Sequence, residues 1–440
     1  MNSVPESKEP SNVDPKPTRA EEIVDAPLHT AMDNGNKREV EFMLRRGDDP
    51  NVVNRWGDTP LHVVCRRDGD DDDSAKLLFE LSRDKYKPIK IDAQNSIGDT
   101  PLHLALRFDN TRLVELLLRK GANPNLANAW RQTPLHVICS RQYTANDLAE
   151  LFFKITEEIR RTVQVNAQTK LGDSPLHLAL DRGHKKLAES LLRRGADPSA
   201  VNANGETPLH VIGRSWHGSS SGADDEFARM FLEICRDVGR QHFPTIIDEP
   251  DNLGNTPLHL ALIHGNERTA ELLLRHGADP NLTNWISGSA ALHMICRRDG
   301  LEDDSLRVLN EFSQERYRPL PINLRDNFGD TPLGRAARHG NKRLCFVEPG
   351  RPRSRNDETI RVQQRLASRK ISDGINFHTP SSTLTRGEGV GTPPLPSTRD
   401  AFSTLLLFSF AFSRWLELFS TSASASTTRK TIGLFPCCIV

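Results

Sequence analysis

The 440-residue sequence lacks the features that mark several classes of protein. It has no run of about 18 uncharged apolar residues, the length needed for a membrane-spanning helix, and it does not begin with the charged-then-apolar order of a secretory signal. Its seven cysteines form neither a CxxC pair nor a dense disulfide pattern. Its 58 basic and 58 acidic residues balance, which disfavours a dedicated nucleic-acid binder. We therefore expect a soluble protein of a reducing compartment, cytoplasmic or, as an alternative, nuclear.

Motifs of the common catalytic sites are missing too. There is no phosphate-binding GxxxxGK[ST], no GxSxG nucleophile elbow, no HExxH and no kinase signature. Only 36% of the residues are apolar and 28 are proline, which is unusual for one compact globule but typical of an elongated array with disordered tails. The sequence thus favours a non-catalytic protein with no cofactor and no small-molecule substrate.

What the sequence does contain is a repeat. A four-residue motif, most often TPLH, begins nine times, and successive starts lie 33, 41, 33, 41, 33, 49, 34 and 41 residues apart. The starts are Ala26, Thr59, Thr100, Thr133, Ser174, Thr207, Thr256, Ala290 and Thr331. Because short and long spacings alternate, we interpret a pair of units as the building block.

Each short unit has the signals of two helices followed by a stop. The motif itself marks a helix start, since Thr59 is a favoured N-cap and Pro60 suits the first helical position, where its missing N–H costs nothing. After the second helix, Gly121 supplies a left-handed stop and Pro124 cannot continue the helix. A unit this small cannot bury its apolar face alone, so stability must come from stacking neighbours.

This pattern resembles the ankyrin repeat. TPLHLA followed by LLLxxGA[DN]PN occurs at Thr100 and Thr256, with a close variant at Ser174, and the resemblance extends over about 320 residues. It implies an all-α solenoid of stacked helix-turn-helix units whose loops or hairpins project as fingers. It also implies hydroxylation at the asparagine that closes the stop, here Asn125 and Asn281.

Four segments follow from these observations: a disordered tail at 1–22, the repeat array at 23–347, a disordered linker at 348–400, and an apolar then low-complexity tail at 401–440. The apolar stretch of the last segment is an interfacial helix, a partner-binding helix, or an incidental product of an altered reading frame. We favour the last because repeat character stops inside a unit. The closing CCIV formally matches a prenylation motif with Cys437 as acceptor, although Val is an unusual last residue.

His62 and Cys65 lie one helical turn apart, a spacing compatible with a shared metal ion. Equivalent units keep the histidine but replace the cysteine, as His103 with Leu106 shows. We therefore predict no metal, a histidine that hydrogen-bonds to the threonine cap and a neighbouring loop, and a buried cysteine. The acidic run DGDDDDS at 68–74 is predicted to form a loop that caps the next helix, where the macrodipole favours negative charge.

One candidate binding surface is a series of finger tips. The residue three before each motif start is mostly large and apolar, and such residues are typical interface anchors. The candidates are Trp56, Ile97, Trp130, Leu171, Leu253 and Phe328, while Asn204 and Ser287 hold the same position in two further units. Either the side chains point outward to a partner or each one folds onto the next finger, and both interpretations remain open.

A second candidate is a basic row at the ends of the first helices, which the resemblance places near a concave surface. Its members are Arg66, Arg67, Arg107, Arg141, Arg182, Arg214, Arg297, Arg298 and Arg338. This row could bind an acidic partner or phosphates. The interpretation that we favour is that these cations complement the dipoles of the helices that they end.

We predict a monomeric, non-catalytic scaffold or adaptor that binds another protein through its fingers and concave helices. A specific interface needs only about 800 Å² per partner, which a few adjacent units can supply. The alternative is the substrate-recruiting subunit of a ubiquitin-ligase complex, which requires a compact helical module within 340–440. Nucleic-acid and membrane partners are not favoured.

Overall fold

The computed structural model describes residues 26–67, 72–86, 88–143, 145–215, 224–238, 246–297 and 304–339. All nine motif starts lie within these ranges. Several predictions fall outside them: the tails at 1–22, 348–400 and 401–440, the prenylation at Cys437, the ligase module, and the binding role of Arg298.

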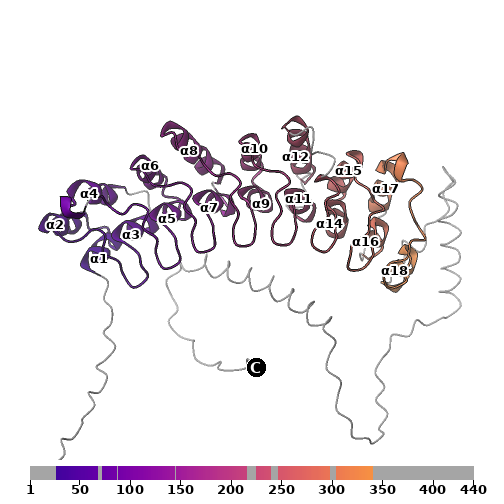
Figure 1. Ribbon diagram of the computed structural model, residues 1–440, viewed down its shortest axis with the longest axis horizontal. Helices are drawn as coiled ribbons and strands as arrows, with labels where there is room; N and C mark the ends of the chain where they lie inside the picture. The colour runs from indigo at the N-terminus through magenta and orange to yellow at the C-terminus, as the bar shows by residue number, and fades with distance from the viewer. Residues whose placement is uncertain are drawn as a thin grey trace, which may run out of the picture. The chain divides into compact units, whose positions relative to one another are not determined.

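The described residues form two rows of helices and contain no strand (Figure 1). The first row begins at the repeat motifs and consists of α1 (Pro27–Asp33), α3 (Pro60–Arg66), α5 (Pro101–Arg107), α7 (Pro134–Ser140), α9 (Pro175–Asp181), α11 (Pro208–Arg214), α14 (Pro257–His264), α16 (Ala291–Arg297) and α18 (Pro332–Arg338). The second row consists of α2 (Lys37–Arg46), α4 (Asp73–Leu81), α6 (Thr111–Arg119), α8 (Ala145–Glu158), α10 (Lys185–Arg193), α12 (Asp224–Val238), α15 (Glu267–Arg275) and α17 (Asp304–Phe312). Each first-row helix packs against the next one in its row, as the all-α solenoid prediction requires.

The first-row helices begin as the sequence predicts. In α5, the Thr100 side chain accepts a hydrogen bond from the His103 backbone N–H at 3.4 Å, and the His103 ring nitrogen Nδ1 accepts one from the Thr100 N–H at 3.2 Å. Pro101 occupies the first helical position, where no N–H is needed. This reciprocal cap satisfies two backbone donors, and losing such a cap typically costs about 1 kcal/mol.

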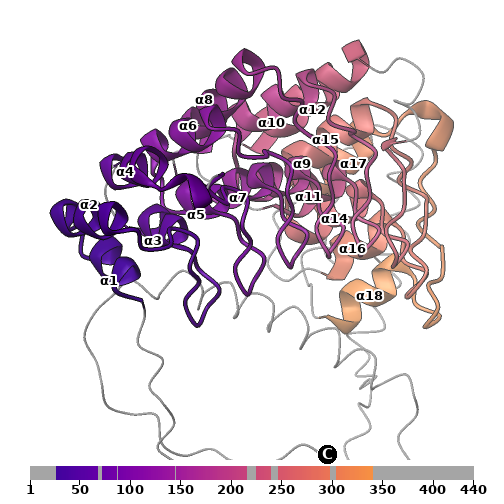
Figure 2. The same cartoon turned by 60° about the vertical axis from the view of Figure 1, so that its left-hand side comes forward.

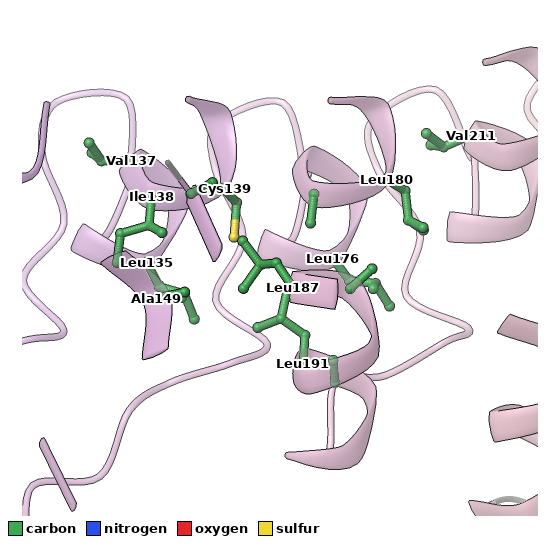
Figure 3. Close-up of a cluster of buried hydrophobic side chains, with 14 of the residues drawn as sticks. Leu135, Val137, Ile138, Cys139, Ala149, Leu176, Leu180, Leu187, Leu191 and Val211 are labelled. Atoms are coloured by element: carbon green, nitrogen blue, oxygen red, sulfur yellow. The ribbon is translucent and has the colours of Figure 1, made fainter. Parts of the chain in front are cut away.

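The core lies between the two rows. In Figure 3, Leu176 from α9 and Leu187 and Leu191 from α10 gather beside Cys139 from α7. All four side chains are buried, and the cysteine is a core residue, as predicted. Each buried leucine contributes about 1.5–3 kcal/mol relative to an exposed one. Helices of only seven to nine residues are too short to be stable alone, so this packing is what holds them.

Side chains tie three of the long units to the short units that follow them. Asn110, the N-cap residue of α6, donates from its buried amide to the Cys65 carbonyl at 3.0 Å and to the Arg67 carbonyl at 2.9 Å. His184 at α10 reaches the Arg141 carbonyl in the same way, at 2.6 Å. These carbonyls end the first helix of a long unit, where helical partners are missing. The two-unit building block thus has a structural basis.

The acidic run does not cap α4 in the way the sequence suggested. Helix α4 begins at Asp73, and the side chain of its N-cap residue, Asp72, makes no cap hydrogen bond. Instead, Asp72 pairs with Lys76 at 2.8 Å, and Asp73 pairs with Lys37 of the preceding unit at 2.8 Å. The hydrogen bond from Lys37 lowers the pKa of Asp73. Both carboxylates lie at the N-terminus of α4, as predicted, but they bind lysines rather than backbone N–H groups. Residues 68–71 of the acidic run lie outside the described ranges.

Candidate functional site

Between each second helix and the next first helix, the chain forms a finger that one buried or half-buried polar side chain holds in shape. In the first finger, Asn54 Oδ1 accepts hydrogen bonds from the Trp56 N–H at 3.0 Å and from the Asp58 N–H at 2.9 Å. Gly57 follows the tip in a left-handed conformation with φ 75°. The same bonding recurs from Asn95, Asn128, Thr169, Asn202, Asp251 and Asp326 in the later fingers.

Backbone hydrogen bonds join each finger tip to the next finger. The Trp56 carbonyl accepts from the Ser96 N–H at 2.9 Å, and the Ile97 carbonyl accepts from the Ala129 N–H at 3.0 Å. Contacts of this kind continue along the array to the Ser287 carbonyl, so the fingers lie side by side in one row (Figure 2). A Cβ atom on Gly98 would lie only 2.5 Å from the Ala129 nitrogen, so this finger leaves no room for a side chain at that position.

The apolar side chains at the tips are exposed. Trp56, Ile97, Trp130, Leu171, Leu253 and Phe328 are all among the exposed large hydrophobic residues, with fractional exposures from 39% for Ile97 to 65% for Phe328. The Arg55 guanidinium lies 3.9 Å from the centre of the Trp56 ring, so one face of that ring is covered by a cation. Outward orientation therefore describes these side chains better than folding onto the next finger. Binding by these residues stays a prediction.

Two exposed residues of this surface were missed in the sequence. The unit that begins at Thr256 is one residue longer than the other short units. Ser287 still carries the hydrogen bonds of a tip, since its N–H donates to Asn284 Oδ1 at 3.2 Å. The extra residue places Trp285 and Ile286 together before the tip, with exposures of 64% and 62%. Both residues could have been found in the sequence by counting forward from Asn284, the polar residue of this finger, as well as backward from the next motif start.

Most motif histidines connect neighbouring units, as predicted. His62 Nδ1 accepts a hydrogen bond from the Thr59 N–H at 3.1 Å, and His62 Nε2 donates to the Asp99 carbonyl of the next finger at 3.0 Å. His103 makes the same pair of bonds, to Thr100 and to the Gln132 carbonyl. Burial lowers the pKa of both rings, so they are neutral at pH 7. Neither ring nitrogen of His62 is left to bind a metal ion.

Much of the basic row is engaged inside the array. Arg66 pairs with Asp58 at 3.0 Å and Arg107 with Asp99 at 2.5 Å, and both carboxylates are almost completely buried. Arg338 pairs with Asp330 over the same separation of eight residues, at 2.8 Å. These pairs neutralise carboxylates at the base of the fingers, a structural role that the dipole interpretation did not foresee. Binding of a partner by this row stays a prediction.

The remaining arginines of the basic row differ in their surroundings. Arg141 donates to the Arg107 carbonyl at 2.9 Å, and Arg214 pairs with Asp181 at 3.0 Å. Arg67 and Arg182 also make interactions within the chain. Arg297 ends α16 and is exposed.

Asn125 and Asn281, the two candidates for hydroxylation, bridge adjacent units. The Asn125 amide donates to the Thr162 carbonyl at 2.7 Å, and its Oδ1 accepts from the Gln164 N–H at 2.8 Å. The Asn281 amide donates to the Tyr317 carbonyl at 3.2 Å. Both side chains therefore have a structural role in the stacking, and hydroxylation stays a prediction.

Within the described ranges, no group of three or more His, Cys, Asp or Glu residues is placed to hold a metal ion. No helix in the same ranges combines the length and the apolar character needed to cross a membrane.

Two rows of short antiparallel helices with fingers bonded in register define a helical repeat solenoid. Comparison with family models identifies the family. The model for ankyrin repeats in three copies matches residues 28–128 and 109–202, and the single ankyrin repeat model matches residues 253–285. The chain is an ankyrin repeat protein, and its array is a protein-interaction domain.

Curated relatives match parts of this chain. The chain is 26% identical over 347 residues to Transient receptor potential cation channel subfamily A member 1 of Homo sapiens, covering 71% of this chain and 29% of that protein. It is 35% identical over 132 residues to NF-kappa-B inhibitor alpha of Sus scrofa, covering 29% of this chain and 39% of that protein. It is 31% identical over 194 residues to Ankyrin repeat and SOCS box protein 16 of Mus musculus, covering 43% of this chain and 38% of that protein. The chain thus spans 29% to 39% of the length of these relatives, and none of the three names is that of an enzyme.

Proposed function

We propose that this chain is a non-catalytic adaptor that binds another protein across its row of finger tips. The observation that carries the proposal is the series of exposed apolar side chains at equivalent places in adjacent fingers. Exposed aromatic side chains in a cluster are typical of interface anchors, whereas isolated exposed apolar residues are ordinary. Ankyrin repeats supply the interaction domain, and the exposed tips supply its contact residues.

The rigidity of the fingers supports this role. Each tip is fixed inside its own finger by a polar side chain, and the tips from Trp56 to Ser287 are fixed to the next finger by a backbone hydrogen bond. Side chains on such a framework lose little conformational freedom on binding, so more of the contact energy appears as affinity. A partner that spans three or four fingers would meet several anchors at once.

Replacing two anchors tests the proposal. We expect the double variant Trp56→Ala with Trp130→Ala to lose at least about tenfold in affinity for the partner, since truncating one anchor usually costs more than about 1 kcal/mol. The partner is first identified by cross-linking in native extract, and its affinity for the purified full chain is then measured. The thermal melting curve should change little because both rings are about half exposed.

A matched control is Phe42→Ala. Phe42 is a 64% exposed aromatic residue on α2, outside the fingers. It should leave the affinity unchanged. Wild-type affinity in the double variant, or an equal loss in the Phe42 variant, would reject the finger tips as the binding surface.

A further inference from the structure

We propose that the first four fingers form a cationic strip that binds an acidic partner segment with interspersed apolar side chains. The strip comprises the tips Trp56, Ile97, Trp130 and Leu171 together with the neighbouring cations Arg55, Arg131 and Lys170. This inference rests on the proposed function and adds the chemistry of the partner. The backbone bonds from Trp56 to Ser96, from Ile97 to Ala129 and from Trp130 to Lys170 make the strip continuous.

The three cations have no carboxylate partner among the residues that the structure describes. Arg55, Arg131 and Lys170 are all exposed, and their side chains appear in none of the ion pairs and hydrogen bonds of the described residues. Arg55 stacks on Trp56, which leaves its charge available at the surface. Arg66 and Arg107, by contrast, are bound to buried aspartates.

The carboxylates that follow these tips are buried or half-buried. Asp58 and Asp99 are buried, and each binds an arginine of the unit that follows it. Asp173 accepts a hydrogen bond from the Asn202 amide at 3.0 Å. The outward surface of the four tips therefore carries cations and apolar groups but no exposed carboxylate. An acidic partner gains attraction here, while a basic partner is repelled.

Arg131 strengthens the inference because its backbone is strained. Glycine occupies the equivalent position in the other fingers, with left-handed φ values such as 75° at Gly57 and 76° at Gly98. Arg131 holds φ 59°, which is unfavourable for a residue with a Cβ atom. Its side chain has no described partner that would compensate for this strain. Strain of this kind is concentrated at binding sites.

The later fingers lack this charge. The residues around their tips are Ala203–Gly205, Asn252–Gly254, Trp285–Gly288 and Asn327–Gly329, none of which is charged. The cationic strip is thus confined to one half of the finger row. A partner segment with acidic residues should bind there rather than along the neutral half.

An acidic peptide fits the strip better than single-stranded nucleic acid. Nucleic-acid channels place aromatic rings in succession and follow the backbone with dense positive charge. Here Ile97 and Leu171 alternate with the two tryptophans, and only three cations serve four fingers. Apolar side chains between carboxylates match that alternation.

The test uses three fluorescently labelled peptides and an oligothymidine with the full chain. One peptide alternates glutamate with leucine and phenylalanine; in the others, glutamine or lysine replaces glutamate. We expect fluorescence anisotropy to show the glutamate peptide binding about tenfold more tightly than the glutamine peptide, because a few exposed charge pairs each add a modest gain. Tighter binding of the oligothymidine, or no binding of the glutamate peptide, would overturn the proposal.

Removing the three positive charges tests whether they cause the preference for the glutamate peptide. The triple variant Arg55→Gln, Arg131→Gln and Lys170→Gln should bind the glutamate and glutamine peptides equally. A control variant with the same loss of charge, Arg45→Gln, Arg119→Gln and Arg193→Gln, changes exposed second-row helices and should keep the full preference. Preserved preference in the first variant, or equal loss in the control, contradicts the cationic strip.

The two proposals fail in different ways. If the full chain binds the glutamate and glutamine peptides equally, and Trp56→Ala with Trp130→Ala weakens both, the finger surface stands and the acidic preference is wrong. If the tryptophan variant binds both peptides and the identified partner like the wild type, the finger surface itself is wrong.

Discussion

Arg131 occupies a left-handed backbone position that glycine fills in the other seven fingers. We predict that Arg131→Gly raises the free energy of unfolding by about 0.5–1 kcal/mol. Glycine relieves a conformational cost of about 1–2 kcal/mol, and its extra freedom in the unfolded chain returns about 0.5–1 kcal/mol of that gain. Urea denaturation followed by circular dichroism measures the change.

Arg131→Ala is the control at this scale because it removes the charge and keeps the Cβ atom that causes the strain. It should show no comparable gain. Equal stability of the two variants would mean that the backbone of Arg131 is not strained. If Arg131 belongs to the cationic strip, the more stable glycine variant should also bind acidic segments less tightly, a trade of stability against binding.

At the scale of the element, the second helices of short units are held by their N-cap side chains. Asn110 donates from its buried amide to two carbonyls at the end of α3. We predict that Asn110→Ala destabilises the chain by about 2–3 kcal/mol, because two hydrogen bonds are lost and a buried carbonyl is left without a partner. Urea denaturation gives the loss, and hydrogen exchange should show it concentrated in α3 and α6.

Asn36→Ala provides the comparison. Asn36 is the N-cap residue of α2, and its exposed side chain bonds only within its own helix, to Glu39. Its loss should cost less than about 1 kcal/mol, as for an ordinary cap. Similar costs for the two variants would show that the bond between units adds nothing.

At the scale of the whole array, the motif histidines couple stability to pH. Burial lowers the pKa of His136 and of His259 to about 4, and it lowers that of His62, His103 and His177 as well. The unfolded chain takes up these protons near pH 6.5, whereas the folded array does not. The stabilising contribution is therefore complete above about pH 6.5 and is lost as the pH falls toward 4. Asp248, whose pKa burial raises to about 6, has the opposite effect.

Because several histidines act together, we expect the free energy of unfolding to fall steeply between pH 6.5 and pH 4, by up to about 1.4 kcal/mol per pH unit for each ring. Urea denaturation over this range measures the slope. The variant His136→Asn should reduce this slope by the contribution of one histidine, which is at most about 1.4 kcal/mol per pH unit. An unchanged slope in that variant would show that His136 is not held neutral by the fold.

Local features of the sequence were sufficient for much of the fold. Thr59 and Pro60 mark a helix start because capping depends on adjacent residues, and α3 does begin at Pro60. The role of His62 followed from comparing copies with and without a neighbouring cysteine. The outward tips were harder: Trp56 was found by position in the repeat, but Trp285 and Ile286 were missed because one extra residue shifted the count.

The sequence by itself determined the repeat, the helix starts and the core positions, because these depend on neighbours within a few residues and recur in every unit. Only the tertiary structure decided which cations are free. Arg66 and Arg107 are bound because the fold brings Asp58 and Asp99 beneath them. Arg55, Arg131 and Lys170 stay unpaired among the described residues, and Asp58 and Asp99 are already bound to other arginines. Charge pairing is set by distances in space, so the recurring separation of eight residues between these partners gained a meaning only from the fold.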